Sequence, residues 1–462
     1  MIERMLDPSR FGKVCPKVRR PSSVAVGRTL SLAAGLAAVG VFVVLPVSAQ
    51  YTSSGTISRA RQVDIPSRES LEKSLEEARW NLGPLRVQPW IGLRNAAYVD
   101  SQAQGGLPGE VRPEENDFTV TAGAGIRAYL RTGSKVTWAA QALPEYTWWQ
   151  DTEEKRGLNG RYGLGVFGHF NRVTLELSHR LEERQDFFSS EVQELTTLER
   201  QTSRLQAEVE IRDGFFAYGK GEQTTLRGDG DDRELFTQLD RDTDTYAAGL
   251  RFEAARGWSV SLGFEETETE FEVDARSLSN EGSAIVGEIF FDGPRLDALV
   301  EVAQRDLEAV EGSTFGDFDD TTGRLDVVWD SGRRTALLGF ARRELGYSVQ
   351  PGFAYFLRGR QGIGVRFGRA GGSSLLLTAA TGEDDFEGVI GDQQIRTDDV
   401  EELTASLGLE LRQLLQLSVN LIYTEYDSNF DAFDRDVTSV GLSVQLGEVA
   451  NRLRLGQSDS IW

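Results

Sequence analysis

Between about Trp90 and Gly447 the chain alternates apolar and polar side chains in steps of two, and short connections between these runs alternate with long ones. Eight tight turns each separate two strand-like runs; they lie at Thr132-Gly133-Ser134, Asn171, Asp213-Gly214, Arg256-Gly257, Asp292-Gly293-Pro294, Asp330-Ser331-Gly332, Ala370-Gly371-Gly372 and Gln413-Leu414. The segments between hairpins are longer, acidic and rich in glycine. A closed antiparallel β-barrel in an outer membrane has this rhythm, because one rim carries turns and the other carries loops.

Within these runs one face is apolar and the other is polar or small, because successive side chains of a strand point to opposite sides. From 117 to 131 the apolar face holds Phe118, Val120, Ala122, Ala124, Ile126, Ala128 and Leu130, and the opposite face holds Thr119, Thr121, Gly123, Gly125, Arg127, Tyr129 and Arg131. The run from 135 to 149 repeats the pattern. The polar faces are rich in Arg and Glu, which are too bulky and charged to fill a core. We therefore expect these faces to line a wet lumen.

One strand on each side of the eight turns gives sixteen strands, and one more at each end gives about eighteen. Bacterial single-chain barrels have an even number of strands. Sixteen is the alternative, because the runs at 88–99 and 215–226 alternate poorly. Either number leaves an aqueous channel, whereas eight strands would be filled by side chains. The sequence thus predicts an all-β fold, a transmembrane antiparallel β-barrel over residues 88–447, with a short N-terminal helix.

The first 49 residues have the features of a secretory signal peptide. Five Lys or Arg residues between positions 13 and 28 precede a charge-free apolar stretch over 30–45, and small residues ending at Ala49 suit the cleavage site. Cleavage there would leave Gln50 as the first residue. An uncleaved membrane anchor is the alternative, although the apolar stretch falls short of the ~20 residues that a spanning helix needs.

Residues 50–87 predict a polar leader followed by a short amphipathic helix between Pro66 and Leu82. One apolar stripe recurs at spacings of four, three and four: Leu71, Leu75, Ala78 and Leu82. Ser67 suits the N-cap, and Gly83-Pro84 is a stop signal. About four helical turns need a partner for this stripe. Three partners remain open: the rim of the barrel on the periplasmic side, the lumen as a plug, or a second copy of the helix.

The composition limits the kinds of partner and chemistry. The chain has a net charge of −22, and its first 49 residues contain seven Lys or Arg and two Asp or Glu, so the rest carries −27. This excess argues against nucleic acid, whose phosphates need a basic surface. The single cysteine, Cys15, lies in the predicted signal peptide. The mature chain would then hold no thiol, which excludes cysteine nucleophiles, thiolate metal sites and disulfides.

Aromatic residues recur within a few residues of the tight turns; they are Phe170, Phe215, Phe216, Trp258, Phe291 and Trp329. Tyr146, Trp148 and Trp149 lie at the opposite end of their run. Outer-membrane barrels carry girdles of aromatic residues at both membrane interfaces. We therefore expect the first set to form a ring at the turn-bearing rim.

With this pattern the chain resembles outer-membrane barrels of the porin kind from about Trp90 to Gly447. The helix and the following Gly83–Arg94, with the sequence GPLRVQPWIGLR, also resemble the start of the barrel in proteins grouped as the beta-barrel porin 2 family. The resemblance implies a barrel fold and an outer-membrane location without naming a solute. Such barrels often close with a strand that ends in an aromatic residue. The residues before Trp462 do not alternate, so 448–462 is either a periplasmic C-terminal tail or part of an unconventional assembly signal.

Few residues offer chemistry. His169 and His179 lie ten residues apart on one hairpin, and a hydrolase would need a histidine with a serine or with paired carboxylates. Neither forms a recognised motif, so we expect no enzyme activity, no catalytic residues and no cofactor. The acidic segment Asp229–Asp232 invites a calcium site, but the spacing of an EF-hand loop fails. Loose divalent binding and a merely solvated acidic loop both stay open there.

Charged residues on the polar parity of their strands are the candidate pore-lining residues. They are Arg127, Arg131, Arg172, Arg180, Arg251, Arg358, Arg360, Arg366, Glu208, Glu210 and Glu410. Rings of charge select which solutes pass through a channel. Alternatively, these charges pair with each other and stiffen the wall. The sequence leaves both interpretations open. In the run 357–368, Ile363, Val365 and Phe367 are expected to meet lipid on the face opposite the arginines.

These observations predict a protein exported to the outer membrane of a diderm bacterium. Its expected partners are outer-membrane lipid and lipopolysaccharide, the barrel assembly machinery and small hydrophilic solutes, and an oligomer is possible. The favoured function is a passive or weakly selective channel, because a wide barrel with a charged polar face holds water. The alternative is a plugged accessory or structural barrel linked to polysaccharide export or envelope organisation.

Overall fold

The computed structural model describes residues 65–101, 115–187, 195–229, 237–254, 257–273, 278–332, 334–350, 352–368, 373–389, 395–411, 415–430 and 433–446. The predicted signal peptide, the leader up to residue 64, the predicted tail, Gly230 to Asp232 of the acidic segment, and the predicted turns Ala370-Gly371-Gly372 and Gln413-Leu414 lie outside these ranges. Within the described ranges, one α-helix, α2 (Arg68–Glu77), and two short 3₁₀ helices, η1 (Glu153–Lys155) and η2 (Thr237–Leu239), accompany the strands.

The strands are β1 (Trp80–Leu82), β2 (Leu85–Ser101), β3 (Glu115–Thr132), β4 (Val136–Trp149), β5 (Gly157–His169), β6 (Val173–Phe187), β7 (Leu195–Arg212), β8 (Phe215–Asp229), β9 (Arg241–Ala254), β10 (Trp258–Phe271), β11 (Asn280–Asp292), β12 (Leu296–Ala309), β13 (Phe318–Asp330), β14 (Thr335–Tyr347), β15 (Phe353–Gly368), β16 (Ser373–Val389), β17 (Thr397–Leu411), β18 (Leu415–Ser428) and β19 (Arg435–Leu446).

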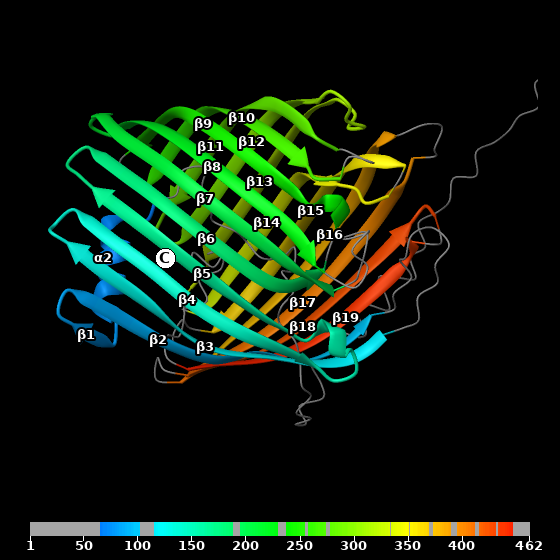
Figure 1. Ribbon diagram of the computed structural model, residues 1–462, viewed down its shortest axis with the longest axis horizontal. Helices are drawn as coiled ribbons and strands as arrows, with labels where there is room; N and C mark the ends of the chain where they lie inside the picture. Colours follow the sequence, from blue (N-terminus) through cyan, green and yellow to red (C-terminus); the bar gives the residue numbers. More distant parts are fainter. Residues whose placement is uncertain are drawn as a thin grey trace, which may run out of the picture. The chain divides into compact units, whose positions relative to one another are not determined.

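Strands β2 to β19 form a closed antiparallel barrel (Figure 1). Each strand pairs with the next one along the chain, and β19 pairs with β2 through partners such as Val440 and Tyr98. The three-residue β1 pairs only with β2 and stands outside the ring of eighteen. The prediction of eighteen strands is therefore confirmed. The two doubtful runs, 88–99 and 215–226, are the barrel strands β2 and β8.

Tight turns join strands at one rim, as the alternation of short and long connections predicts. The turn between β9 and β10 shows why glycine is needed there. Gly257 has φ +79°, and a Cβ on it would lie 2.0 Å from the carbonyl oxygen of Asp292 on the neighbouring hairpin. Only glycine adopts this left-handed conformation without strain and also leaves room for the adjacent backbone.

The outer surface near the turns is an apolar belt about four outward side chains tall. On β10 the outward residues Trp258, Val260, Leu262 and Phe264 are all exposed, while the inward Ser259 and Ser261 are buried. A soluble barrel would place its apolar face inside. An exposed apolar band about 25 Å tall is instead the lipid-facing surface of a membrane barrel. Among the described residues no helix has the length and apolar character that crossing a membrane requires.

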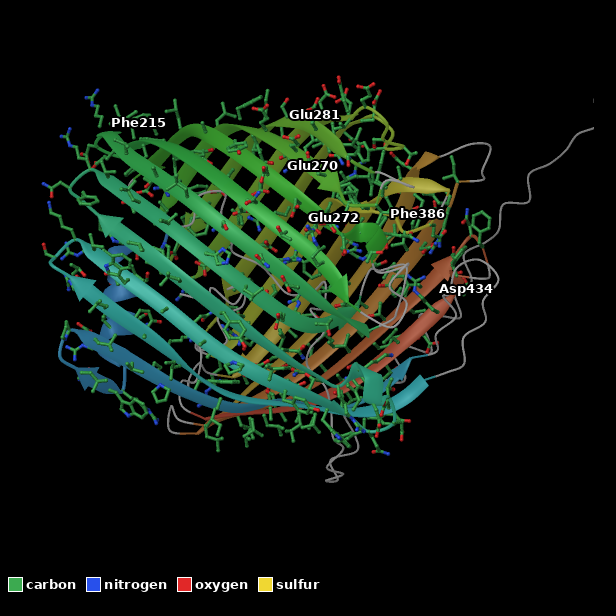
Figure 2. The ribbon with its side chains drawn as sticks, viewed as in Figure 1. Phe215, Glu270, Glu272, Glu281, Phe386 and Asp434 are labelled. Carbon is green, nitrogen blue, oxygen red and sulfur yellow. The ribbon has the colours of Figure 1, made fainter. Side chains whose placement is uncertain are left out.

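The predicted aromatic ring is found at the turn-bearing rim with one correction. Phe170, Phe215, Trp258 and Trp329 are between 42% and 49% exposed there (Figure 2 labels Phe215). Phe216 does not belong to the ring. It pairs in register with Arg251, whose guanidinium lies 4.9 Å from its ring on the inner face. Phe215 and Phe216 are neighbours on one strand, so only one of them can point outward.

The N-terminal helix is present but shorter than the predicted Pro66–Leu82 segment. The Ser67 side chain accepts a hydrogen bond from the Ser70 amide, so Ser67 is the N-cap, as predicted. The helix ends at Glu77, and the chain turns at Gly83 between β1 and β2. Pairing of Leu82 with Leu85 removes the last residue of the predicted stripe from the helix.

Candidate functional site: the lumen and its two mouths

Charges that face the lumen pair between adjacent strands or between strands two apart in the barrel. Oxygen–nitrogen distances are 2.6 Å for Arg204–Glu222, 2.6 Å for Arg251–Glu208, 2.7 Å for Arg305–Glu265, 3.2 Å for Arg324–Glu301 and 3.5 Å for Arg342–Asp326. These side chains are each at most about one-quarter exposed. The wall is therefore polar, but much of its charge is neutralised locally and held in a fixed geometry.

Most of the predicted pore-lining residues belong to such pairs. The pairs are Arg131–Glu72 at 3.1 Å, Arg180–Glu176 at 3.9 Å, Arg251–Glu208 at 2.6 Å, Arg358–Asp384 at 3.7 Å, Arg360–Asp384 at 2.8 Å and Arg366–Asp330 at 3.3 Å. Arg127 and Glu210 share the inward parity of β3 and β7 and are partly buried. Glu410 lies in β17 opposite Gln416, and its side chain is outside the described part of the chain.

Arg172 departs from the predicted set. It lies in the turn before β6 and is exposed, and its carbonyl oxygen accepts the Glu210 amide. Arg172 belongs to the turn, so strand β6 begins at Val173, one residue later than predicted. Arg172 therefore stands at the rim and not on the wall.

The arginine strand β15 has opposite surroundings on its two faces. Arg360 is 6% exposed, and its guanidinium pairs with Asp384 and donates to the carbonyl oxygens of Gly359 and Glu383. Ile363 on the other face is 73% exposed. Arg360 is therefore held tightly on the inner side and does not project as a loose charge.

Helix α2 packs against the inner wall at the turn-bearing end. Leu71, which is 2% exposed, forms one cluster with three inward-facing residues, Tyr129, Ala139 and Phe167. Leu75 of the same stripe and Ile65 border this cluster. The helix shares the wall of the lumen near its turn-side mouth (Figure 1). Of the three predicted partners for the stripe, these contacts favour the lumen, since the helix packs on its inner wall.

Polar contacts hold α2 beside this apolar cluster. The Glu72 carboxylate lies 2.9 Å from Arg68 on the same helix and 3.1 Å from Arg131 on β3. The hydrogen bond from Arg68, together with the Arg131 charge, lowers the pKa of Glu72. The ring of His169 is 2.9 Å from the carbonyl oxygen of Pro66, and the Arg79 amide donates to the Gln88 side chain. Helix and wall are thus joined on both sides of Leu71.

The loop-side mouth contains an apolar core that the sequence analysis missed. Ten buried residues from β10 to β15, from their connections and from η2 form it: Leu239, Phe271, Leu278, Leu307, Phe315, Phe318, Val349, Ala354, Tyr355 and Leu357. The Tyr355 ring contacts Phe315 and Phe318 at centroid distances of 5.2 and 5.5 Å. One signal was available: residues 353–357, Phe-Ala-Tyr-Phe-Leu, are all apolar and all buried. A run without alternation indicates burial on both faces.

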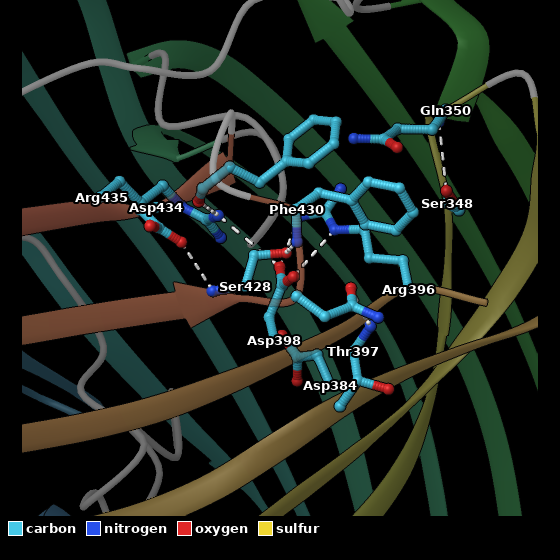
Figure 3. Close-up of polar contacts among 12 residues, drawn as sticks. Ser348, Gln350, Asp384, Arg396, Thr397, Asp398, Ser428, Phe430, Asp434 and Arg435 are labelled. Atoms are coloured by element: carbon cyan, nitrogen blue, oxygen red, sulfur yellow. Dashed lines mark hydrogen bonds and ion pairs between the residues drawn. The ribbon is translucent and has the colours of Figure 1, made fainter. Parts of the chain in front are cut away.

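An ionic cluster lies beside this core (Figure 3). Asp384 and Asp398 are direct register partners on β16 and β17, both almost completely buried. Like charges at such positions repel. Four guanidinium groups compensate: Arg358 and Arg360 pair with Asp384, Arg396 binds Asp398 through two nitrogens, and Arg435 lies 3.7 Å from Asp398.

Aromatic rings cover the guanidinium groups of Arg396 and Arg435. The Arg396 guanidinium carbon is 3.8 Å from the Phe433 ring centroid and 4.3 Å from that of Phe386, and Arg435 lies 3.7 Å from that of Tyr426. Stacking on aromatic faces stabilises a cation that has lost water. Arg396 lies in a long connection between strand patterns, so strand parity could not identify it.

The two histidines make structural contacts. His169 bonds to Pro66, as described above, and Nδ1 of His179 lies 2.9 Å from the Ser203 hydroxyl on the outer face. Both members of the second pair are exposed. Within the described ranges no group of three or more His, Cys, Asp or Glu side chains is arranged to hold a metal ion.

Comparison with known proteins identifies the fold. No family model matches the sequence, and no curated protein does so significantly. The BenF-like porin from Pseudomonas fluorescens Pf-5 superposes with a TM-score of 0.50 at 10% identity, over 78% of this chain and 98% of the porin. OccAB3 from Acinetobacter baumannii and OccK2 from Pseudomonas aeruginosa, the latter in complex with glucuronate, cover the same shares at 10% identity with TM-scores of 0.47. The chain therefore has the barrel fold of a porin.

Proposed function

We propose that this chain is an outer-membrane porin, a channel through which small hydrophilic solutes diffuse. The observation that carries the proposal is the opposite character of the two barrel faces. Leu262 and Phe264 on the outer face of β10 are exposed, whereas inward positions of the wall hold paired Arg and Glu. Apolar side chains outside and ions inside suit a barrel that is surrounded by lipid and filled with water.

Selectivity by charge should be weak. Arg180, Arg251, Arg358, Arg360 and Arg366 each have a carboxylate within 4 Å. A solute passing such pairs meets a dipole and not a bare charge. We therefore expect the wall to admit both anions and cations of small size, with only a modest preference.

Planar-bilayer recording of the refolded chain without residues 1–49 tests the proposal. We expect stable ohmic steps in conductance and a small reversal potential in a KCl gradient. A barrel that is folded, as judged by a heat-dependent shift in gel migration, but never conducts would contradict an open channel.

A plugged accessory barrel is the second candidate, and the docked α2 favours it. Leu71 is buried against the inner wall, so the helix occupies part of the turn-side mouth. Deletion of residues 50–78 separates the two functions. A plugged barrel becomes conductive only after the deletion, whereas an open porin conducts in both forms.

The biogenesis expected for this function includes export, cleavage after Ala49 and insertion by the barrel assembly machinery, with lipopolysaccharide around the belt. Membership of the beta-barrel porin 2 family belongs to the same proposal. The support is the signal-like sequence of residues 1–49, the segment Gly83–Arg94 and the exposed belt. N-terminal sequencing of protein extracted from outer membranes tests it. A chain that still begins before Gln50 would contradict the predicted cleavage.

A further inference from the structure

The apolar outer face is much taller on β3 and β4 than on the other side of the barrel. On β3 all seven outward positions from Leu130 back to Phe118 are apolar, and on β4 so are all seven from Val136 to Trp148. On β10 only four outward positions are apolar, and Glu266, Glu268 and Glu270 follow. Strands β4 and β10 are both 14 residues long, so the different height of the apolar face comes from their side chains and not from strand length. The three extra outward positions correspond to six residues, which add roughly 15 Å of height on a tilted strand.

The upper part of this tall face is open to its surroundings. Tyr146 and Trp148 on β4 are 49% and 37% exposed, and Leu158 on β5 is 66% exposed. Phe118 packs edge-on against Trp148 at a centroid distance of 6.4 Å. We call these residues, with Val120 and Tyr162 between them, the upper β3–β5 patch. It continues without a break into the lipid-facing belt below.

At the same height the wall opposite is acidic. Asp244, Glu268, Glu281 and Glu308 are direct register partners in sequence across β9, β10, β11 and β12. Figure 2 labels Glu270 and Glu281 at the loop-bearing ends of their strands. A second row, Glu401, Glu425 and Asp436, crosses β17, β18 and β19. Like charges in direct register repel each other, and these rows would repel any second acidic surface.

We propose that two copies of this chain associate side by side in the membrane through β3–β5, each covering the upper β3–β5 patch of the other. The proposal goes beyond the channel function and needs only the membrane location. A two-fold contact uses the same patch on both partners. The acidic rows cross β9–β12 and β17–β19. Two copies that approached each other through those strands would therefore repel each other. Of these three stretches of the described outer wall, β3–β5 alone carries no acidic row at this height.

The whole β3–β5 face, belt and upper patch together, has the area of a modest interface. Three strands about 4.8 Å apart and roughly 33 Å tall present on the order of 500 Å² in projection. The accessible surface of their corrugated side chains is larger, and standard interfaces use about 800 Å² per partner. Part of this area is the lipid-facing belt; the part above it, the upper β3–β5 patch, is the apolar surface that a partner would cover.

Cysteine cross-linking in native outer membranes tests the contact. A Cys15→Ser background removes the only thiol. Tyr146→Cys then places a thiol in the patch, and Glu268→Cys places one at the same distance from the turn rim on the acidic side. We expect mild oxidation to give a disulfide-linked dimer of twice the chain mass for Tyr146→Cys and less than a tenth as much for Glu268→Cys. We also expect Tyr146→Glu to raise the dimer dissociation constant in detergent at least tenfold, with the heat-dependent gel shift of a folded barrel retained.

Three outcomes would overturn the proposal. A folded Tyr146→Cys barrel that forms no adduct would show that the patch is not an interface. An adduct of another mass would show that a different protein covers it. Equal dimer yields from the two cysteines would reflect random collision in the membrane.

Discussion

The Glu72 carboxylate of α2 lies 3.1 Å from the Arg131 guanidinium on β3, and Glu72 directly follows the buried Leu71 in the helix. The ion pair is well exposed, and exposed pairs contribute little to stability because water screens them. Burial of a leucine side chain contributes about 1.5–3 kcal/mol. The apolar contact thus supplies most of the docking free energy, and the ion pair orients the helix on the wall.

Substitution of Leu71 should release the helix. Leu71→Ala removes part of an apolar contact, at a cost of about 2–3 kcal/mol, which lowers the ratio of docked to undocked helix roughly 30- to 150-fold. If the docked helix obstructs the lumen, mean single-channel conductance rises toward that of the form lacking residues 50–78. Lys73→Ala, an exposed change on the same helix, is the matched control and should leave conductance unchanged. Equal traces from both variants would show that α2 does not obstruct the pore.

Acidification should weaken the docking of α2. The pKa of Glu72 is lowered chiefly by the hydrogen bond from Arg68 on the same helix and also by the charge of Arg131 on β3; the Arg131 contribution exists only in the docked state, which therefore favours the carboxylate. The contribution of this group is present above the ordinary value near 4.5 and is lost as pH falls through the lowered pKa. Helix-dependent closure should therefore decrease below about pH 4.5. The channel is compared at pH 7 and 4, with Glu72→Gln as control; a pH effect of the same size in that variant would assign it to another group.

The sequence predicted the barrel because strand parity is a property of local residues. On β10 the alternation of Trp258, Val260 and Leu262 with serines predicts which face meets lipid. In the structure the three apolar side chains are exposed on the outer face and the serines are buried. Eighteen strands followed from counting turns. Phe216 was misplaced because nearness to a turn does not decide which face an aromatic ring occupies; its pairing with Arg251 does.

The lumen was less predictable, because its contacts join strands far apart in sequence. Arg360 was identified by parity, but its partner Asp384 depends on the register of β15 with β16. Arg396 and the core around Tyr355 lie where connections fold back on the barrel. A two-residue alternation does not apply there, so it could not predict their contacts. Docking of Leu71 on Phe167 likewise depends on tertiary packing across about a hundred residues.

The outer face of β15 should reject charge. Val365→Arg places a guanidinium in the lipid-facing belt at a cost of roughly 2–4 kcal/mol near the midplane. Gln361→Arg adds the same charge to the same face at its polar border, where the cost is roughly 0–1 kcal/mol. We expect the first variant to lose at least 90% of heat-modifiable barrel in the outer membrane and the second to assemble normally. Equal yields would mean that β15 does not present this face to lipid.

Removing one member of a lumen pair should change ion selectivity in the direction of the charge left behind. Arg251→Gln leaves Glu208 without its 2.6 Å partner, so the reversal potential in a KCl gradient should shift toward cations. Glu208→Gln leaves the guanidinium and should shift it toward anions. Shifts of opposite sign and of a few millivolts to ~10 mV are expected from one charge in a wide pore. The absence of any shift in two conducting variants would place this pair outside the ion path.

The pair of Arg360 with Asp384 should matter for stability more than for selectivity. Strand parity alone places Arg360 in a wet lumen, where loss of its charge would not disturb folding, but its near-complete burial against Asp384 predicts otherwise. Breaking a buried ion pair by removing one partner costs about 3–5 kcal/mol, because the other charge stays buried. Arg360→Gln should therefore lower the temperature at which the folded gel band is lost. Arg360→Gln combined with Asp384→Asn should recover most of that loss, since it also removes the repulsion between Asp384 and its register partner Asp398. A double variant less stable than Arg360→Gln would show that Asp384 is needed by the remaining guanidinium groups of Arg358, Arg396 and Arg435 more than it is opposed by Asp398.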